Sequence, residues 1–210
     1  MIDLYTWATP NGRKVSIMLE ELGLPYNVIE VNISKGEQHS PAFLEISPNN
    51  RIPAIVDPDG PDGKPISVFE TGAILVYLAE KTGSDLLPKG GRERVATFEW
   101  LMWQMGGVGP MFGQAHHFLF KPSEVVPYGQ KRYHDETKRL YMVMNDRRLH
   151  KNEYLAGDFY SIADIAVYPW VSRHERHQVD LNEFPNVKRW FDTISAREAV
   201  QKGMAVPFAN

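Results

Sequence analysis

The spacing of apolar positions changes partway along the chain. In the first part, short apolar runs alternate with stretches of helical spacing, whereas in the second part almost every apolar pattern has the period of a helix. Alternating strands and helices are typical of a sheet covered by helices, and continuous helical spacing is typical of a bundle. The sequence therefore predicts an α/β N-terminal domain at residues 1–83, a linker at 84–91 and an all-α domain at 92–210.

The first part predicts an alternating order of strands and helices. Ile2–Trp7 and Tyr26–Ile33 are apolar runs on either side of a helical stretch that Gly23 ends. Two strands joined by a helix favour a parallel pair with a right-handed crossover. The remaining predicted elements are a short helix at Pro41–Ile46, strands at Ile52–Asp57 and Ile66–Phe69, and a helix that starts at Glu70-Thr71-Gly72. This order matches a thioredoxin-like layout.

The second part predicts four helical segments after a linker rich in proline and glycine. Ser161-Ile162-Ala163-Asp164 opens one of them in the manner of a capping box. The glycine-rich run Gly106–Pro110 predicts a break after the first segment, and its pattern does not match a phosphate-binding loop. The four segments are Arg92–Gln104, Tyr128–Leu149, Ser161–Val171 and Val187–Ser195.

The amino-acid composition limits the kinds of partner that we expect the protein to bind. The 210 residues are 43% hydrophobic and 23% charged, which is ordinary for a soluble globular protein, and the net charge is -3. Without a basic excess, general nucleic-acid binding is not expected. The first ten residues lack the pattern of a signal peptide, and no apolar run has membrane-spanning length. We therefore expect a cytoplasmic protein without nucleic acid or membrane as a partner.

The chain contains no cysteine, and this limits its chemistry. Disulfides, thiolate metal ligands and a cysteine nucleophile are excluded, so any thiol chemistry must use a thiol that a ligand brings in. The pair His116-His117 invites a metal site, but no carboxylate or cysteine cluster accompanies it in the sequence. A packed or solvated histidine pair is favoured, and no metal is expected.

Two strand-to-helix turns carry polar residues with two interpretations each. Thr9-Pro10-Asn11-Gly12 can be a plain turn, or it can aim the Thr9 hydroxyl or the Asn11 amide at a reacting group above the positive end of a helix. Glu70-Thr71 can be a simple helix cap. Alternatively, the first-turn amides hold a carboxylate and Glu70 accepts from an ammonium, which together suit the zwitterionic end of an amino acid.

The Ile52-Pro53 step also has two interpretations. On base rates the proline is trans and stands at the entrance of an edge strand. A cis bond would instead leave the amide and carbonyl of Ile52 unpaired and facing a cleft, where an extended peptide ligand can pair with them.

Taken together, these positions resemble the glutathione transferase family over essentially the whole chain. The motifs that carry the resemblance are Ser47–Ile55, Glu70–Ile74 and Tyr160–Ile165. Thr9–Gly12 and Trp100–Gln114 resemble the bacterial Nu class of that family. The resemblance implies a thioredoxin-like domain followed by an all-helical domain, and a homodimer.

The resemblance also implies a binding site for glutathione, reduced or oxidised. It implies that Pro53 is cis, that the Ile52 backbone pairs with the cysteinyl part of glutathione, and that Glu70 and Thr71 hold the γ-glutamyl end.

Four further residues receive roles by the same resemblance. Asn11 and Gln38 contribute hydrogen bonds, and Arg132 reaches over from the helical domain. Thr9 is the hydroxyl that faces the sulfur, so Thr9 and Asn11 are the expected catalytic residues.

The expected activity follows from a departure within this resemblance. Other transferase classes use a tyrosine, serine or cysteine near the first turn, but here Tyr5 lies inside the first predicted strand. The Nu class implies reduction of small disulfides by glutathione, with transferase or peroxidase side activity. Two alternatives remain: a conventional transferase that conjugates electrophiles, and a non-enzymatic module that binds glutathione for regulation.

Overall fold

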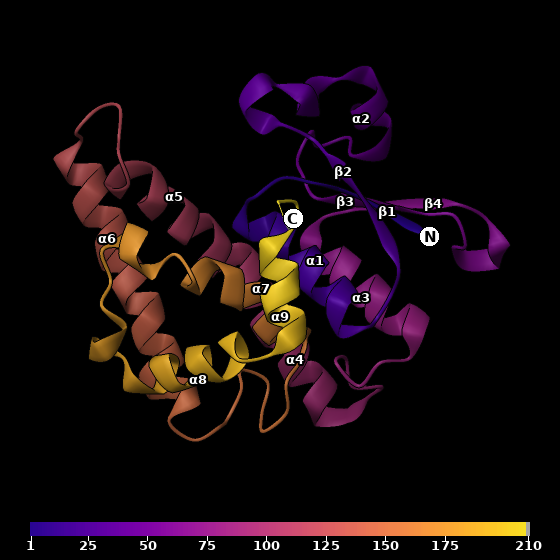
Figure 1. Ribbon diagram of the computed structural model, residues 1–210. Helices are drawn as coiled ribbons and strands as arrows, with labels where there is room; N and C mark the ends of the chain where they lie inside the picture. Colours follow the sequence, from indigo (N-terminus) through magenta and orange to yellow (C-terminus); the bar gives the residue numbers. More distant parts are fainter. Residues whose placement is uncertain (209–210) are drawn as a thin grey trace. The chain divides into compact units, whose positions relative to one another are not determined.

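The computed structural model describes residues 1–208, which form two compact units. One unit contains residues 1–84 together with 197–208, and the other contains residues 85–196. The first unit holds a four-stranded sheet, and the second is helical (Figure 1). The predicted fold, a thioredoxin-like α/β part and an all-helical part, is confirmed.

The sheet of the first unit has the strand order β2-β1-β3-β4. The strands are β1 (Ile2–Thr6), β2 (Tyr26–Glu30), β3 (Ala54–Asp57) and β4 (Ile66–Phe69). β1 and β2 are parallel, as the crossover predicted, whereas β3 is antiparallel to both β1 and β4. The predicted strand at Tyr26–Ile33 is shorter in the structure, because Ile33 begins a turn of 3-10 helix.

Four α-helices accompany this sheet. They are α1 (Pro10–Glu21), α2 (Pro41–Ile46), α3 (Thr71–Thr82) and α9 (Glu198–Ala205). α1 and α3 lie side by side on one face of the sheet, and α2 lies on the other side (Figure 1). Short 3-10 helices occur at Ile33–Lys35, Glu37–His39 and Pro61–Gly63.

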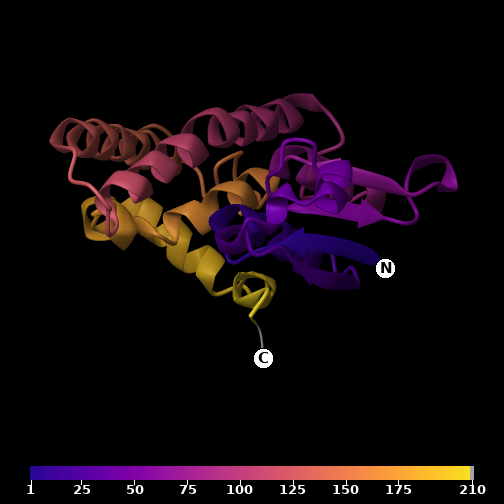
Figure 2. The same ribbon diagram turned by 90° about the horizontal axis from the view of Figure 1, so that it is seen from above.

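The helix α9 is last in the chain, yet it packs along α1 (Figures 1 and 2). The Ser16 hydroxyl donates to the Gly203 carbonyl at 2.7 Å, and a methyl group on Gly203 would lie 2.5 Å from the Ile17 Cα. Arg197 binds Glu21 through two hydrogen bonds of 2.6 and 2.7 Å. The expected division counted residues 92–210 as one helical domain, whereas by packing α9 belongs to the first unit.

The second unit is built from five α-helices and two π-helical segments. Its core contains Leu101, Phe112, Tyr141, Ile165 and Trp190, all fully buried. Within residues 1–208, none of the helices is long and apolar enough to cross a membrane. The elements are α4 (Gly91–Trp103), π-helical Gln104–Val108, α5 (Gly109–Leu119), α6 (Pro127–Met142), π-helical Val143–Leu149, α7 (Ile162–Val171), 3-10 segments His174–His177 and Leu181–Glu183, and α8 (Pro185–Ser195).

The predicted break at Gly106–Pro110 is wrong, because the backbone stays helical from α4 into α5. Pro110 lies in the first turn of α5, where a missing amide hydrogen is tolerated, and the preceding segment adopts wider π-helical turns. A methyl group on Gly109 would lie 2.8 Å from Nε2 of buried Gln104, so a larger residue here would require the Gln104 side chain to move. The predicted capping box at Ser161 and Asp164 is confirmed.

Candidate functional site

The register of the sheet gathers three segments at one edge. Ala54, the first residue of β3, lies opposite Tyr5 of β1 and also opposite Phe69 of β4. The turn after β1, the approach to β3 and the turn after β4 therefore meet at the same edge. These segments contain, in chain order, Thr9 and Asn11, Ile52 and Pro53, and Glu70 and Thr71.

The turn after β1 is fixed by backbone and side-chain bonds. Thr9 caps α1, because its hydroxyl oxygen accepts from the Gly12 amide at 3.1 Å. A methyl group on Gly12 would lie 2.4 Å from the Trp7 carbonyl oxygen, so only glycine fits. The Thr9 hydroxyl still carries its own proton, and half-buried Asn11 lies in the first turn of the helix. Both polar groups therefore stand at the positive end of α1.

The peptide bond between Ile52 and Pro53 is cis, as the resemblance implied, so the base-rate expectation of a trans proline is wrong. Strand pairing of β3 begins at Ala54, and among the described residues Ile52 has no partner in the sheet. The preceding loop is held by buried Ser47, whose hydroxyl donates to the Arg51 carbonyl at 2.9 Å. Ile52 can therefore offer its backbone groups to an extended ligand.

Gln38 lies in the 3-10 helix Glu37–His39, the second of two such helices after β2 in the chain. Its side-chain nitrogen is 3.3 Å from His39 Nε2, while its side-chain oxygen is buried and has no hydrogen-bond partner among the described residues. A buried acceptor without a partner is uncommon in proteins. The Gln38 oxygen therefore suits a donor supplied by a ligand.

The turn after β4 is strained at Glu70. This residue has φ 68 and ψ 117, a backbone conformation that residues other than glycine rarely adopt, and its side chain is exposed and forms no cap bond. Thr71, the first residue of α3, is buried. An exposed carboxylate beside the amides of a helix N-terminus suits an amino-acid end, with its ammonium on Glu70 and its carboxylate at Thr71.

Lys14 lies beneath this turn, and sequence reasoning missed it. It is 1% exposed, and its ammonium donates to the Thr71 hydroxyl oxygen at 3.3 Å. Burial lowers the pKa of Lys14 to about 7, although the charge of Glu70 acts in the opposite direction. The available signal was its spacing, because Lys14 precedes apolar Met18 by four residues and so shares the buried face of α1.

Arg132 is an exposed residue of α6 in the second unit. It lines an open cavity of 690 Å³ together with Met111, Tyr128 and Tyr133. The neighbouring cations have partners in α6: Lys131 pairs with Asp135 at 2.5 Å, and Arg139 with Glu136 at 2.7 Å. No such ion pair engages Arg132 within residues 1–208, so its guanidinium is available to an anionic ligand.

The adjacent histidines of α5 point to different surroundings. The His116 ring is 5.0 Å from that of Phe120, whereas exposed His117 packs on Phe118. In the part of the chain that the structure describes, no three histidine, cysteine, aspartate or glutamate side chains gather where a metal ion could be held.

Together these features of the first unit suit a small extended peptide with a free amino-acid end. Ile52 offers strand-type pairing, the Gln38 oxygen an acceptor, and the Glu70-Thr71 turn a place for an ammonium and a carboxylate. The turn at Thr9 adds a hydroxyl at a positive helix end. Such an end lowers the pKa of a thiol placed on it.

Two family models match the chain. The model described as "Glutathione S-transferase, N-terminal domain" matches residues 8–81. The model described as "Glutathione S-transferase, C-terminal domain" matches residues 108–198.

Individual relatives match over nearly the full length. Disulfide-bond oxidoreductase YfcG of Escherichia coli strain K12 is 52% identical over 205 residues, 97% of this chain and 94% of that protein. A glutathione transferase from Burkholderia graminis, solved with two glutathione molecules per subunit, is 45% identical, with a TM-score of 0.92 over 100% of this chain and 89% of the other. One from Pseudomonas putida, solved with one glutathione disulfide per subunit, is 46% identical, with a TM-score of 0.92 over 98% and 91%.

Proposed function

The chain belongs to the glutathione S-transferase family, and from this premise we propose that it is a glutathione-dependent disulfide-bond oxidoreductase with transferase and peroxidase side activity. One observation carries the proposal: a site suited to a peptide with an amino-acid end lies in a chain with no cysteine. The reacting thiol must then belong to the ligand, and glutathione supplies both the peptide and the thiol.

The proposed binding mode assigns each part of glutathione to a segment of the sheet edge. The γ-glutamyl ammonium binds Glu70, and its carboxylate binds Thr71 at the start of α3. The cysteinyl part pairs with the backbone of Ile52 beside Pro53, and this places the sulfur toward the turn at Thr9. The buried oxygen of Gln38 and the amide of Asn11 provide further hydrogen bonds, with the Gln38 oxygen gaining the partner that it lacks.

The proposed reaction is thiol–disulfide exchange in two steps. The thiolate of one glutathione attacks a sulfur of the substrate disulfide, forms a mixed disulfide and releases the first substrate thiolate, which takes up a proton. The thiolate of a second glutathione then attacks the mixed disulfide, forms oxidised glutathione and releases the second thiol. Two glutathiones are oxidised and one disulfide is reduced. Relatives solved with two glutathiones or one glutathione disulfide support this stoichiometry.

Thr9 and Asn11 activate the thiol in this proposal. The threonine hydroxyl does not titrate near neutral pH, so it acts as a hydrogen-bond donor to the sulfur, together with the positive end of α1. Such stabilisation lowers the thiol pKa but also lowers the nucleophilicity of the thiolate. The lower nucleophilicity slows the attack of the thiolate on a poor electrophile more than it slows exchange with a disulfide.

The test compares two reactions at equal glutathione concentration. We expect clear reduction of hydroxyethyl disulfide and weak conjugation of a chloronitrobenzene. Conjugation that greatly exceeds disulfide reduction would favour the conventional transferase instead. Bound glutathione with neither rate above the uncatalysed one would favour the non-enzymatic module.

Arg132 is proposed as a ligand residue contributed by the helical unit, for a carboxylate of glutathione or of a second glutathione. Its support is the open cavity on α6, where the neighbouring Lys131 and Arg139 already have partners. Arg132→Ala should lower turnover or raise the glutathione requirement and leave the melting temperature unchanged. A large loss of thermal stability would instead identify Arg132 as a structural residue.

We also propose that the protein belongs to the Nu class, is cytoplasmic, and acts as a homodimer on small disulfides or electrophiles. Neither nucleic acid nor a membrane is proposed as a partner.

The dimer is supported by α4, where Val95 is 59% and Met102 is 55% exposed beside Phe98 and Arg94. An apolar helix face of this kind is typical of an interface. Sedimentation at micromolar concentration tests it, and a species at the 24.0 kDa chain mass would refute the dimer.

A further inference from the structure

Lys14 is a charged side chain inside the core of the first unit, and the proposed reaction has no step for it. It lies on α1, is 1% exposed, and donates to the Thr71 hydroxyl oxygen at 3.3 Å. Removing an ammonium from water is costly, so buried lysines are rare unless a partner or a function keeps them. An aliphatic side chain of similar length would fill the same space without this cost.

The charge of Lys14 fixes the direction of its hydrogen bond to Thr71. An ammonium has only donors, so the Thr71 oxygen must accept and the threonine proton is directed to another acceptor. A neutral amine can accept, and the threonine proton can then turn toward Lys14. Thr71 is the first residue of α3, where the helix N-terminus attracts a carboxylate.

We propose that Lys14 is a positioning residue for the γ-glutamyl carboxylate of glutathione: in its charged form it orients the Thr71 hydroxyl as a donor to that carboxylate. The inference rests on the proposed function, which supplies the ligand. Lys14 does not touch the reacting sulfur in this arrangement. It acts through Thr71 and sets the affinity for glutathione rather than the chemistry of exchange.

The arrangement makes glutathione affinity depend on pH. Burial lowers the pKa of Lys14 to about 7, and the charge of Glu70 opposes this shift from the start of α3. Between pH 6 and pH 8 Lys14 therefore passes from mainly charged to mainly neutral. The Thr71 proton loses its fixed direction over the same interval, so glutathione binds more weakly as the pH rises.

The other charged and titratable groups on the elements packed against α1 have partners of their own. On the α9 side, Arg197 pairs with Glu21 and Lys202 pairs with Glu198. In α3, Lys81 pairs with Asp57, which also accepts from Tyr77. In β1, Asp3 accepts from Asn27, and the Tyr5 ring packs on Phe43. The charge of Glu70 acts on Lys14 directly and opposes the lowering of its pKa.

The experiment measures binding of S-methylglutathione, whose blocked sulfur cannot titrate, by calorimetry at pH 6 and pH 8. If only protein with charged Lys14 binds tightly, the dissociation constant of the wild type should rise about tenfold across this range. Lys14→Met keeps the length of the side chain and removes the charge, so it should bind weakly at both pH values with less than a twofold change. Lys64→Met, a matched change at an exposed lysine, should behave as the wild type.

Each outcome decides between the inference and the proposed function. A wild-type affinity that is equal at pH 6 and pH 8 overturns the role of Lys14 while glutathione binding stands. The same follows if Lys14→Met keeps the wild-type pH dependence. If Lys14→Met does not fold, proton uptake by the wild type at pH 7, measured in two buffers of different ionisation enthalpy, decides: uptake supports the inference and none overturns it. No binding at either pH overturns the proposed function and the inference with it.

Discussion

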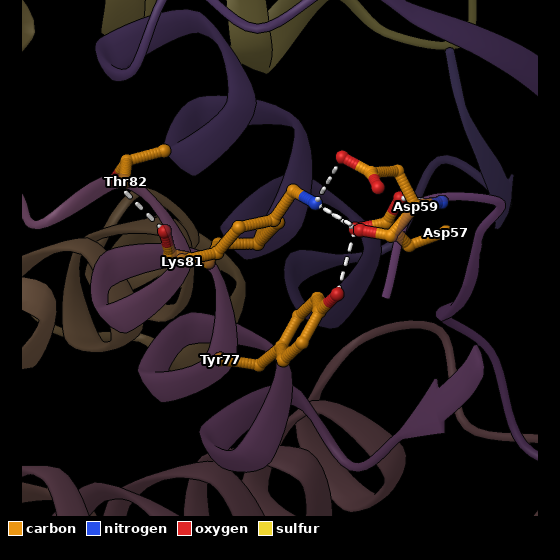
Figure 3. Close-up of polar contacts among 6 residues, drawn as sticks. Asp57, Asp59, Tyr77, Lys81 and Thr82 are labelled. Atoms are coloured by element: carbon orange, nitrogen blue, oxygen red, sulfur yellow. Dashed lines mark hydrogen bonds and ion pairs between the residues drawn. The ribbon is translucent and has the colours of Figure 1, made fainter. Parts of the chain in front are cut away.

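A lysine and an acidic residue lie at each end of α3, but the two ends are built in opposite ways. At the C-terminal end, Lys81 lies 3.0 Å from the buried carboxylate of Asp57, which also accepts from the Tyr77 hydroxyl at 2.7 Å (Figure 3). At the N-terminal end, Glu70 is exposed in a strained backbone conformation, and Lys14 is buried beneath it. The C-terminal end satisfies its polar groups within the protein, and the N-terminal end is the one at which we propose that glutathione binds.

The pKa values of the two lysines show the same contrast. The hydrogen bond to Asp57 raises the pKa of Lys81, whereas burial lowers the pKa of Lys14 to about 7. A lysine with a raised pKa stays charged at all physiological pH values and serves stability. A lysine that titrates near neutrality can respond to what binds above it. The difference predicts that changes at the C-terminal end affect folding and changes at the N-terminal end affect binding.

The largest expected effect is at the C-terminal end. Asp57→Ala removes the acceptor of Tyr77 and Lys81 and should lower the free energy of unfolding by about 3 kcal/mol, because the remaining partners lose a buried acceptor. Urea denaturation measures the loss, and glutathione affinity of the folded variant should change less than twofold. Asp59→Ala is the matched control, since this carboxylate is 87% exposed and its removal should cost less than about 0.5 kcal/mol.

The pH dependence of stability provides a second test of the role of Asp57. Burial alone would raise the pKa of Asp57, but hydrogen bonds from Tyr77, the Asp59 amide and Lys81 hold it below the ordinary 3.8. The stabilisation is therefore present above pH 3.8 and is lost as the pH falls through the lowered pKa. The difference in free energy of unfolding between the wild type and Asp57→Ala should decrease below pH 3.8. A difference that stays constant into that range would contradict the ionic role of Asp57.

The next effect is at the N-terminal end. Glu70→Ala should weaken glutathione binding by about 2 kcal/mol, or about 30-fold, because a charge-assisted bond to the γ-glutamyl ammonium is lost. Circular dichroism should show an unchanged fold. Glu70→Gln, which keeps an acceptor without the charge, should lose less. Unchanged affinity on calorimetry for Glu70→Ala would remove this residue from the site.

A smaller effect is expected at Thr9, where stability and function overlap. Thr9→Ala removes the cap of α1 and should lower the free energy of unfolding by about 1 kcal/mol. It should also reduce disulfide reduction only partly, about fivefold, since the helix end remains. Thr9→Ser keeps the hydroxyl and should restore both quantities. Asn11→Ala should harm activity at least as much; full activity in both alanine variants would exclude the proposed activation of the thiol.

The smallest effect is the most direct test of the contrast. Glu70→Gly relieves the strained backbone conformation and should raise the free energy of unfolding by about 0.5 kcal/mol, after the entropy cost of glycine is subtracted. Glutathione binding should weaken as in Glu70→Ala. A lower free energy of unfolding for Glu70→Gly than for Glu70→Ala, measured by urea denaturation, would contradict backbone strain at this position.

Elements with strong local signals were predictable from the sequence. The helix at Pro41–Ile46 and the strand at Ile66–Phe69 match the structure end to end, because proline, glycine and aspartate mark their boundaries. The cap at Ser161 was predictable for the same reason. Local signals failed at Gly106–Pro110, where glycine and proline indicate a break but the backbone stays helical, with Pro110 in the first turn of α5.

The candidate site was predictable only in part. The turns at Thr9 and Glu70 could be located as strand-to-helix turns, and their meeting at one edge follows from strand order, which local patterns do not give. The strained backbone of Glu70 has no sequence signature, since glutamate is not a residue that such a conformation favours. Lys14 was missed because a lysine in a helix is ordinarily exposed, and its buried hydrogen bond to Thr71 joins two helices that lie far apart in the sequence.

The position of α9 also has a consequence for biosynthesis. α9 is translated after all of the second unit, yet it covers a face of α1 that is translated near the beginning of the chain. On the ribosome, the sheet and its first helices must wait with Ser16 and Ile17 uncovered until Gly203 leaves the exit tunnel. The first unit to be made is the last to be completed.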